Sequence, residues 1–94
     1  MIESIKHKGL KNYWEYGDES KVPPDMRKRI RHILDLLDNA EEIPQDFEPF
    51  KNLRLHPLKG KMKGRWSLDV TGNFRITFKF ENKNVFDVDL EDTH

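Results

Sequence analysis

The fold is decided by residues 66–90, which read WSLDVTGNFRITFKFENKNVFDVDL. Apolar residues occupy every second position in three runs, the pattern of strands with one buried face. The runs are Trp66, Leu68 and Val70; Phe74, Ile76, Phe78 and Phe80; and Phe86, Val88 and Leu90. Gly72-Asn73 and Asn82-Lys83 separate the runs with residues that favour tight turns. The stretch therefore predicts an antiparallel meander whose other face is polar and carries Arg65, Arg75 and Lys79.

Two helices are predicted upstream of this sheet. Leu10, Tyr13 and Trp14 are spaced like one face of a helix that ends at Gly17. A second helix opens at Pro24-Asp25. Its apolar stripe consists of Met26, Ile30, Ile33, Leu34 and Leu37. Because the helices precede the sheet, we predict one α+β domain over residues 1–94, with two N-terminal helices packed on one face of a small antiparallel sheet.

The other segments are predicted to form two short strands and a loop. Ile2 and Ile5 suggest an edge strand. Residues 43–50 contain two prolines and are expected to form a loop, pinned to the core by Phe47 and Phe50. The alternation over residues 53–56 predicts a further strand that Pro57 ends.

Composition excludes several classes of protein. The 94 residues include 17 basic and 17 acidic side chains and no cysteine, so a disulfide framework and thiolate chemistry are absent. No apolar run approaches the length of a membrane span, and the N-terminus lacks the apolar core of a signal peptide. We therefore expect a soluble, cytoplasmic protein without a membrane partner.

The positive charge of this neutral chain is concentrated in one segment. Residues 51–65 hold one histidine, no acid and six cations, namely Lys51, Arg54, Lys59, Lys61, Lys63 and Arg65. Such a run favours binding of an anion, with phosphate as the first candidate, although a solvated loop has the same composition. Further cations, Arg27, Lys28 and Arg31, lie on the polar side of the second predicted helix.

Two histidines could supply acid–base chemistry on a phosphodiester. His56 lies within the cationic run and His94 is the last residue. Histidine titrates near neutrality, and nearby arginine or lysine would stabilise negative charge on a phosphoryl group. In RNA the nucleophile can be the 2′-hydroxyl of the substrate itself, so no metal or other cofactor is called for. The alternatives are a backbone-bonded strand-end role for His56, a solvated Arg75 and a frayed terminus at His94.

Several motifs together resemble the HigB-type toxins of the RelE/ParE superfamily, the toxic half of bacterial type II toxin–antitoxin pairs. The motifs appear in the family's order at residues 5–10, 55–60, 66–68, 73–78 and 91–94. The most specific of them are LHPLKG at 55–60 and NFRITF at 73–78. The resemblance implies the RelE-like fold of two helices on an antiparallel sheet.

The resemblance also implies an activity and its residues. It implies a metal-independent endoribonuclease that cuts mRNA on the translating ribosome, with catalytic residues His56, Lys59, Arg75, Asp92 and His94. The cations that would bind mRNA and ribosomal RNA are Arg27, Lys28, Arg31, Arg54, Lys61, Lys63 and Arg65. The partner implied is a HigA-type helix-turn-helix antitoxin, which would carry the pair to operator DNA.

The sequence departs from the family at two positions. Thr71 stands where family members often have a further cation, in the hairpin before the Arg-Ile-Thr run. Thr93 stands where family members commonly have a tyrosine that would stack on or position a base. Two other functions therefore stay open: a protein that binds the ribosome or antitoxin without cutting, and a ParE-like gyrase poison. The combination of His56, Lys59 and His94 favours the nuclease over the gyrase poison, because a gyrase poison needs no acid–base groups.

Overall fold

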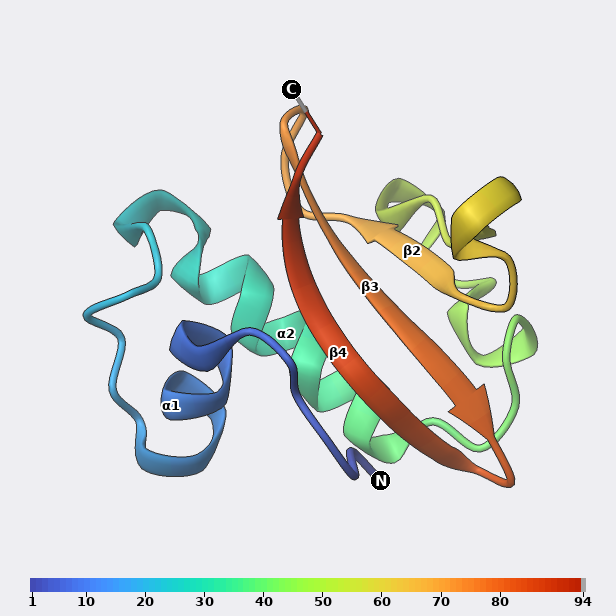
Figure 1. Cartoon of the computed structure of the whole chain (residues 1–94), viewed down its shortest axis with the longest axis horizontal. Helices are drawn as coiled ribbons and strands as arrows, with labels where there is room; N and C mark the ends of the chain where they lie inside the picture. Colours follow the sequence, from blue (N-terminus) through green and yellow to red (C-terminus); the bar gives the residue numbers. More distant parts are fainter. Residues whose placement is uncertain (94) are drawn as a thin grey trace.

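A four-stranded antiparallel sheet in the order β1-β2-β3-β4 forms the centre of the fold (Figure 1). The computed structural model describes residues 1–93. The strands are β1 (His56–Pro57), β2 (Trp66–Asp69), β3 (Phe74–Glu81) and β4 (Asn84–Asp92), preceded by helices α1 (Lys8–Tyr16) and α2 (Arg27–Asn39). Short 3₁₀ turns lie at Pro24–Met26, Gln45–Phe47, Lys51–Leu53 and Gly60–Met62. The predicted α+β architecture is confirmed.

The core lies between the two helices and one face of the sheet. Leu68 pairs with Ile76 across β2 and β3, and both side chains are fully buried. The predicted stripe of α2 meets this face, and Ile30, Ile33 and Leu34 are fully buried. Phe47 is buried and Phe50 packs against the core, as predicted. Burial of these apolar groups supplies most of the stability of the domain.

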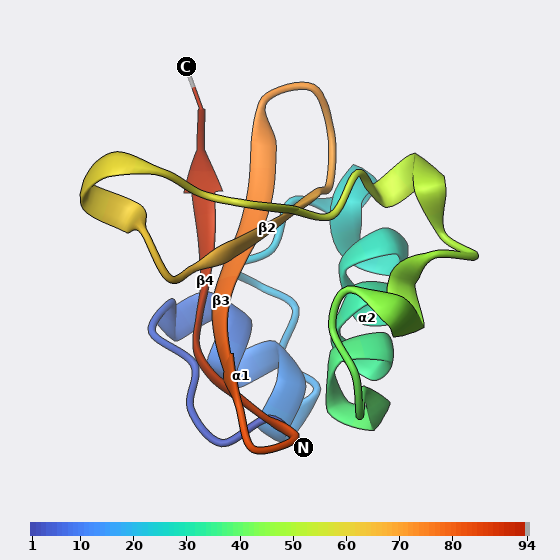
Figure 2. The same cartoon turned by 90° about the vertical axis from the view of Figure 1, so that its right-hand side faces the viewer.

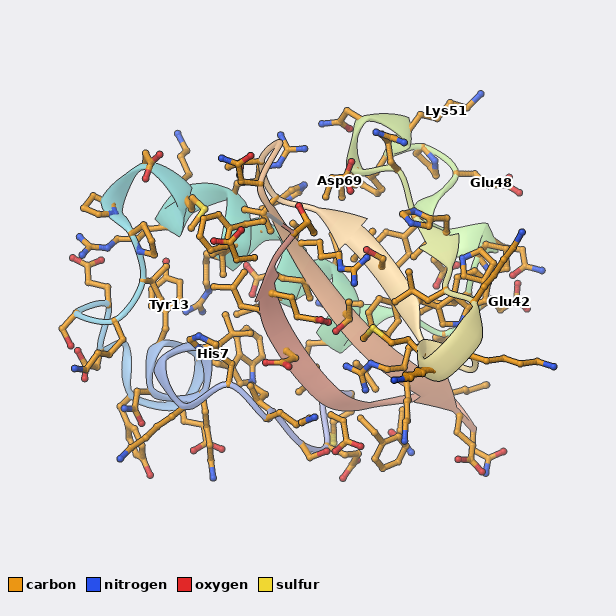
Figure 3. The ribbon with its side chains drawn as sticks, turned by 45° about the horizontal axis from the view of Figure 1, so that its top comes forward. His7, Tyr13, Glu42, Glu48, Lys51 and Asp69 are labelled. Carbon is orange, nitrogen blue, oxygen red and sulfur yellow. The ribbon has the colours of Figure 1, made fainter. Side chains whose placement is uncertain are left out.

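Each helix is defined by local features of the sequence. His7 caps α1, because its Nδ1 accepts the backbone N–H of Leu10 at 3.0 Å. Gly17 ends the helix in the left-handed conformation with φ 71°. Tyr13 connects the helices by donating its hydroxyl to the carbonyl of Arg27 in α2 at 3.1 Å. Figure 3 shows His7 and Tyr13 on the α1 side of the molecule.

Within residues 1–93, no α-helix packs on the second face of the sheet. Figure 2 shows α2 on one side of the strands and the Gly60–Met62 turn on the opposite side. We call this second surface the polar face; its residues on β3 include Arg75 and Thr77. Since the helices leave it accessible, the polar face is the surface on which a site can be built.

The N-terminal segment runs parallel to β4. Ile2 and Ile5 form isolated parallel bridges with Val85 and Val88. The N–H of Glu3 donates to the carbonyl of Val85 at 2.7 Å, and the N–H of Lys6 donates to that of Val88 at 2.7 Å. The predicted edge strand is thus present only as two isolated bridges beside β4.

The predicted strand over residues 53–56 is wrong in its boundaries. Lys51–Leu53 form a 3₁₀ turn, and Arg54 then adopts a left-handed backbone with φ 50°. The strand begins only at His56 and includes Pro57. A proline is tolerated there because β1 lies at the edge of the sheet, where the missing N–H breaks no ladder.

The alternation predicted for the last strand is wrong at its start. Val85 is fully buried, whereas Phe86 is only partly buried. A β-bulge shifts the register between Thr77 and Lys79, and Asp87 opposite it has φ 51°. One extra residue in a strand moves the following side chains to the other face. The alternation between core-facing and outward-facing side chains therefore shifts by one residue at Asp87, and Val88 faces the core as predicted.

Among residues 1–93, no helix is long and apolar enough to cross a membrane.

Candidate active site

Two rows of side chains cross the polar face. In the first, Asp69 pairs with Arg75, which pairs with Glu91. In the second, Ser67 pairs with Thr77, which pairs with Asp89. Directly opposed residues point to the same side of a sheet, so the register alone gathers these groups on one surface.

Arg75 is held in place on this face. Its Nη2 lies 3.7 Å from Glu91 Oε1 and 3.6 Å from the sulfur of Met62. The side chain is 26% exposed, and its Nε is buried without a hydrogen-bond partner among the described residues. A phosphate would therefore have to bind at the exposed part of the guanidinium rather than at Nε.

Thr77 connects two charged groups, Arg65 and Glu91, under the surface. It is fully buried, accepts Arg65 Nη2 at 2.9 Å and donates its hydroxyl to Glu91. Arg65 Nη2 also donates to the carbonyl of Asp87 at 2.7 Å. Arg65 was predicted as a solvent-facing RNA ligand, but these contacts fix one end of its guanidinium within the protein.

His56 lies on the polar face at the edge of the sheet. It pairs with Ser67, the partner of Thr77, so two strand spacings, about 10 Å, separate the backbones of His56 and Thr77. Arg75 is two residues from Thr77 and therefore points to the same side. The Nδ1 of His56 lies 2.7 Å from the carbonyl oxygen of Arg54. The backbone bond considered in the sequence analysis is thus present, and it leaves Nε2 for other partners.

The cationic loop covers part of this face. Lys59 is exposed directly before the Gly60–Met62 turn, and Lys61 and Lys63 are also exposed. Met62 reaches Arg75, which places the loop over β3. The loop thus brings predicted cations to the surface that carries Arg75.

A cavity of about 370 Å³, which we call the polar cavity, opens between this loop and β4. Its lining residues are Lys6, Lys61, Met62, Lys63, Arg65, Lys79, Asp87, Asp89 and Glu91. Lys79 Nζ lies 3.8 Å from Asp87 Oδ2. The cavity combines five cations with three carboxylates, so its positive groups already have counter-ions nearby.

Several groups in this arrangement were missed by sequence reasoning. Glu91, Thr77 and Lys6 were not predicted as site residues. The two-residue period that places Arg75 on the polar face also places Thr77 there. Glu91 could have been found from the β3–β4 hairpin register, whereas Lys6 depends on the pairing of residues 1–6 with β4.

The C-terminal candidates are placed only in part. Asp92 is exposed and pairs with Phe74, so strand alternation directs it to the face opposite that of Glu91 and Arg75. His94 lies outside the described residues.

The cations of α2 form a separate group. Arg27 binds within the protein, donating Nε to the carbonyl of Val22 at 2.8 Å and pairing with Glu19 at 3.2 Å. Arg31 lies over the Trp14 ring, 5.1 Å from its centroid, and pairs with Asp35 at 3.5 Å. Lys28 is exposed. Because α2 packs against the other face of the sheet, these cations are not brought together with the 59–65 loop.

The same fold occurs in solved structures of YafQ. The chain aligns with the crystal structure of YafQ from E. coli BL21(DE3) with a TM-score of 0.58 and 19% identity, over 98% of this chain and 91% of that one. A mutant form of YafQ from E. coli gives a TM-score of 0.59 and 20% identity over the same shares. At these identities the likeness concerns the fold alone.

Sequence similarity defines the family. Residues 3–94 match the HigB-like toxin family, described as the RelE-like toxin of type II toxin-antitoxin system HigB. The chain is also 44% identical to the Endoribonuclease HigB of Proteus vulgaris over 94 residues, the full length of both. This protein belongs to the HigB-like toxins of type II toxin–antitoxin systems, as the motifs predicted.

Proposed function

We propose that this chain is a ribosome-dependent endoribonuclease that cuts mRNA with the 2′-hydroxyl of the substrate as nucleophile. The observation that carries the proposal is the placement of His56 and Arg75 on one accessible face, beside the cationic loop and the polar cavity. The name of the Proteus vulgaris relative, an endoribonuclease, supports the same reaction class.

The chemistry requires one base, one acid and stabilisation of charge. A base, His56 or His94, takes the proton of the 2′-hydroxyl, and the oxygen attacks the adjacent phosphorus; Asp92 is left out of this set because strand alternation directs it to the other face. The bond to the 5′-oxygen breaks, and an acid from the same set protonates that leaving oxygen, giving a cyclic phosphate and a free 5′-hydroxyl. Arg75 and Lys59 stabilise the negative charge that develops on the phosphoryl oxygens.

The RNA backbone on either side of the cleaved bond would lie along the loop and the polar cavity. Lys61, Lys63 and Lys79 would contact flanking phosphates, with Lys6 at the far side of β4. Arg54 is 74% exposed beside β1 and would bind at the His56 end. The α2 cations Lys28 and Arg31 would contact ribosomal RNA rather than the cleaved strand, because they lie on the helix side of the sheet.

A type II toxin has a cognate antitoxin, and we propose a HigA-type helix-turn-helix protein that neutralises this toxin. Operator DNA would then be bound through the antitoxin. Ribosome-dependent cleavage would also place the toxin in the cytoplasm.

The test is single-turnover cleavage of mRNA on programmed ribosomes by wild type, His56→Ala, Arg75→Ala and a chain lacking His94. Loss of a general acid or base lowers the rate by about 10²–10⁴. Lys11→Ala, an exposed position on α1, is the control and should cut at the wild-type rate. Wild-type rates in all three site variants would refute the proposal.

The competing functions give different results in the same cells. Discrete, codon-linked mRNA 5′ ends after induction support the nuclease. Ribosome binding without such ends would indicate a non-cutting binder, and DNA double-strand breaks would indicate a gyrase poison.

A further inference from the structure

We propose that Arg54 is a positioning residue, whose left-handed backbone fixes the His56 ring as the Nδ1–H form with Nε2 directed to the substrate. The inference rests on the proposed function of His56, but it concerns a different residue and a property of the free protein.

The proton on Nδ1 follows from the hydrogen bond. The Nδ1 of His56 lies 2.7 Å from the carbonyl oxygen of Arg54. A carbonyl oxygen can only accept, so Nδ1 must carry the proton. Neutral His56 then has its lone pair on Nε2 and can take a proton there; in the charged form Nε2 carries a proton it can give. The Arg54 carbonyl thus reserves Nε2 for the reaction in both states.

The direction of that carbonyl depends on an unusual backbone. Arg54 has φ 50° and ψ 51°, a conformation that residues with a side chain rarely adopt. Of the other non-glycine residues with positive φ among residues 1–93, Asn82 and Lys83 form the β3–β4 hairpin turn and Asp87 lies at the bulge. Arg54 belongs to neither feature; it follows the 3₁₀ turn that ends at Leu53, and the chain continues through Leu55 to His56.

Three contacts hold this conformation. Arg54 Nη1 lies 3.4 Å from Asp69 Oδ2, at the end of β2. From α2, Arg29 Nη2 donates to the carbonyl of Asn52 at 3.3 Å and, more weakly, to that of Asp69 at 3.5 Å. Arg29 therefore connects helix α2 to the backbone just before Arg54 and to the backbone of Asp69. A rare backbone conformation at a functional site is expected to be held by several surrounding contacts of this kind.

The test separates the backbone of Arg54 from its charge. Arg54→Asn and Arg54→Val both remove the guanidinium, but asparagine tolerates the left-handed region and the β-branched valine does not. Arg54→Gly is a second permissive variant. The ¹⁵N shifts of the His56 ring, measured in the free protein near neutral pH, report which nitrogen carries the proton.

The expected result is a predominantly Nδ1–H ring in wild type, Arg54→Asn and Arg54→Gly, and a loss of this form in Arg54→Val. In cleavage assays, kcat of the valine variant should lie about 10-fold to 100-fold below that of the asparagine variant, the size of loss seen when groups that orient metal-bound histidines are removed. KM should change equally in both, because both lack the same charge.

Two results would overturn the inference: a predominantly Nε2–H ring in wild type, or the same ring form in the valine and asparagine variants. If Arg54→Val does not fold, Arg29→Met provides the second route, since it releases residues 52–54 without changing Arg54. It should reduce the Nδ1–H form, and an unchanged ring would count against the proposal. Because the ring measurement uses no RNA, its outcome is independent of whether the protein cuts mRNA.

Discussion

Arg75 and Glu91 are direct partners across β3 and β4, and Arg75 Nη2 lies 3.7 Å from Glu91 Oε1. In the free protein a carboxylate therefore already lies beside the guanidinium that we propose as a phosphate ligand. An RNA phosphate bound to Arg75, as proposed, would have to compete with Glu91 for the guanidinium.

Glu91→Gln should therefore tighten binding of single-stranded RNA. A partly exposed ion pair is worth up to about 1 kcal/mol, so the expected decrease in Kd is about twofold to fivefold. The measurement is equilibrium binding of a short RNA at fixed salt. Glu81→Gln, an exposed change at the end of β3 with the same charge difference, is the control. Equal tightening in both variants would mean that net charge, rather than competition at Arg75, sets the affinity.

Thr77→Val should destabilise the domain by about 1–3 kcal/mol, because Arg65 and Glu91 would each lose a buried hydrogen-bond partner. Urea unfolding gives the free energy. Ser67→Ala is a matched control: Ser67 lies opposite Thr77 and is equally buried, but its hydroxyl has no hydrogen-bond partner in the described structure. It should be nearly neutral or stabilising. A similar loss in both variants would contradict the assigned role of Thr77.

Lys79→Ala should reduce the salt dependence of RNA binding. Each phosphate contact with a single strand contributes about 0.7 to the slope of log K against log salt, so loss of one contact should lower the slope by about that amount. Lys11→Ala removes the same charge from α1, outside the polar cavity, and should leave the slope unchanged. An unchanged slope in Lys79→Ala would exclude this lysine from the RNA path.

Asp46 should make the 40–47 turn sensitive to acid. Its carboxylate accepts the backbone N–H groups of Glu41 at 2.8 Å and Glu42 at 3.1 Å, and these bonds lower the pKa of Asp46 below the ordinary value of 3.8. Because the folded state favours the charged form, the stabilisation is complete above pH 3.8 and is lost as the pH falls through the lower folded pKa.

Asp46→Asn should consequently be less stable than wild type at about pH 6, with the difference shrinking on acidification below the ordinary aspartate pKa of about 3.9. Urea unfolding at several pH values measures it, and amide exchange at Glu41 and Glu42 localises it. A stability difference that stays constant throughout the acid range would contradict this role.

Periodicity was sufficient to predict the central architecture. The alternation around Ile76 and Phe78 and the stripe of α2 each identified a buried face, and the layers followed because those faces must meet. The polar placement of Arg75 followed from the same period. What alternation could not predict was the bulge at Asp87, because a single inserted residue leaves no clear trace in composition.

The site was less predictable than the fold. The position of Arg54 depends on a left-handed backbone held by Arg29 and Asp69, which are both distant from it in the chain. Glu91 lies at the site because the β3–β4 register places it opposite Arg75. Lys6 lies there because two parallel bridges hold residues 1–6 beside β4. Long-range relationships of this kind are not encoded in any local pattern.

Both borders of the sheet are partly closed to an incoming strand. On one side, β1 is two residues long and includes Pro57, which has no N–H to offer. On the other, the N–H and carbonyl of Val85 and Val88 already bond to residues 1–6. A neutralising protein that added a strand beside Val85 and Val88 would therefore have to displace residues 1–6.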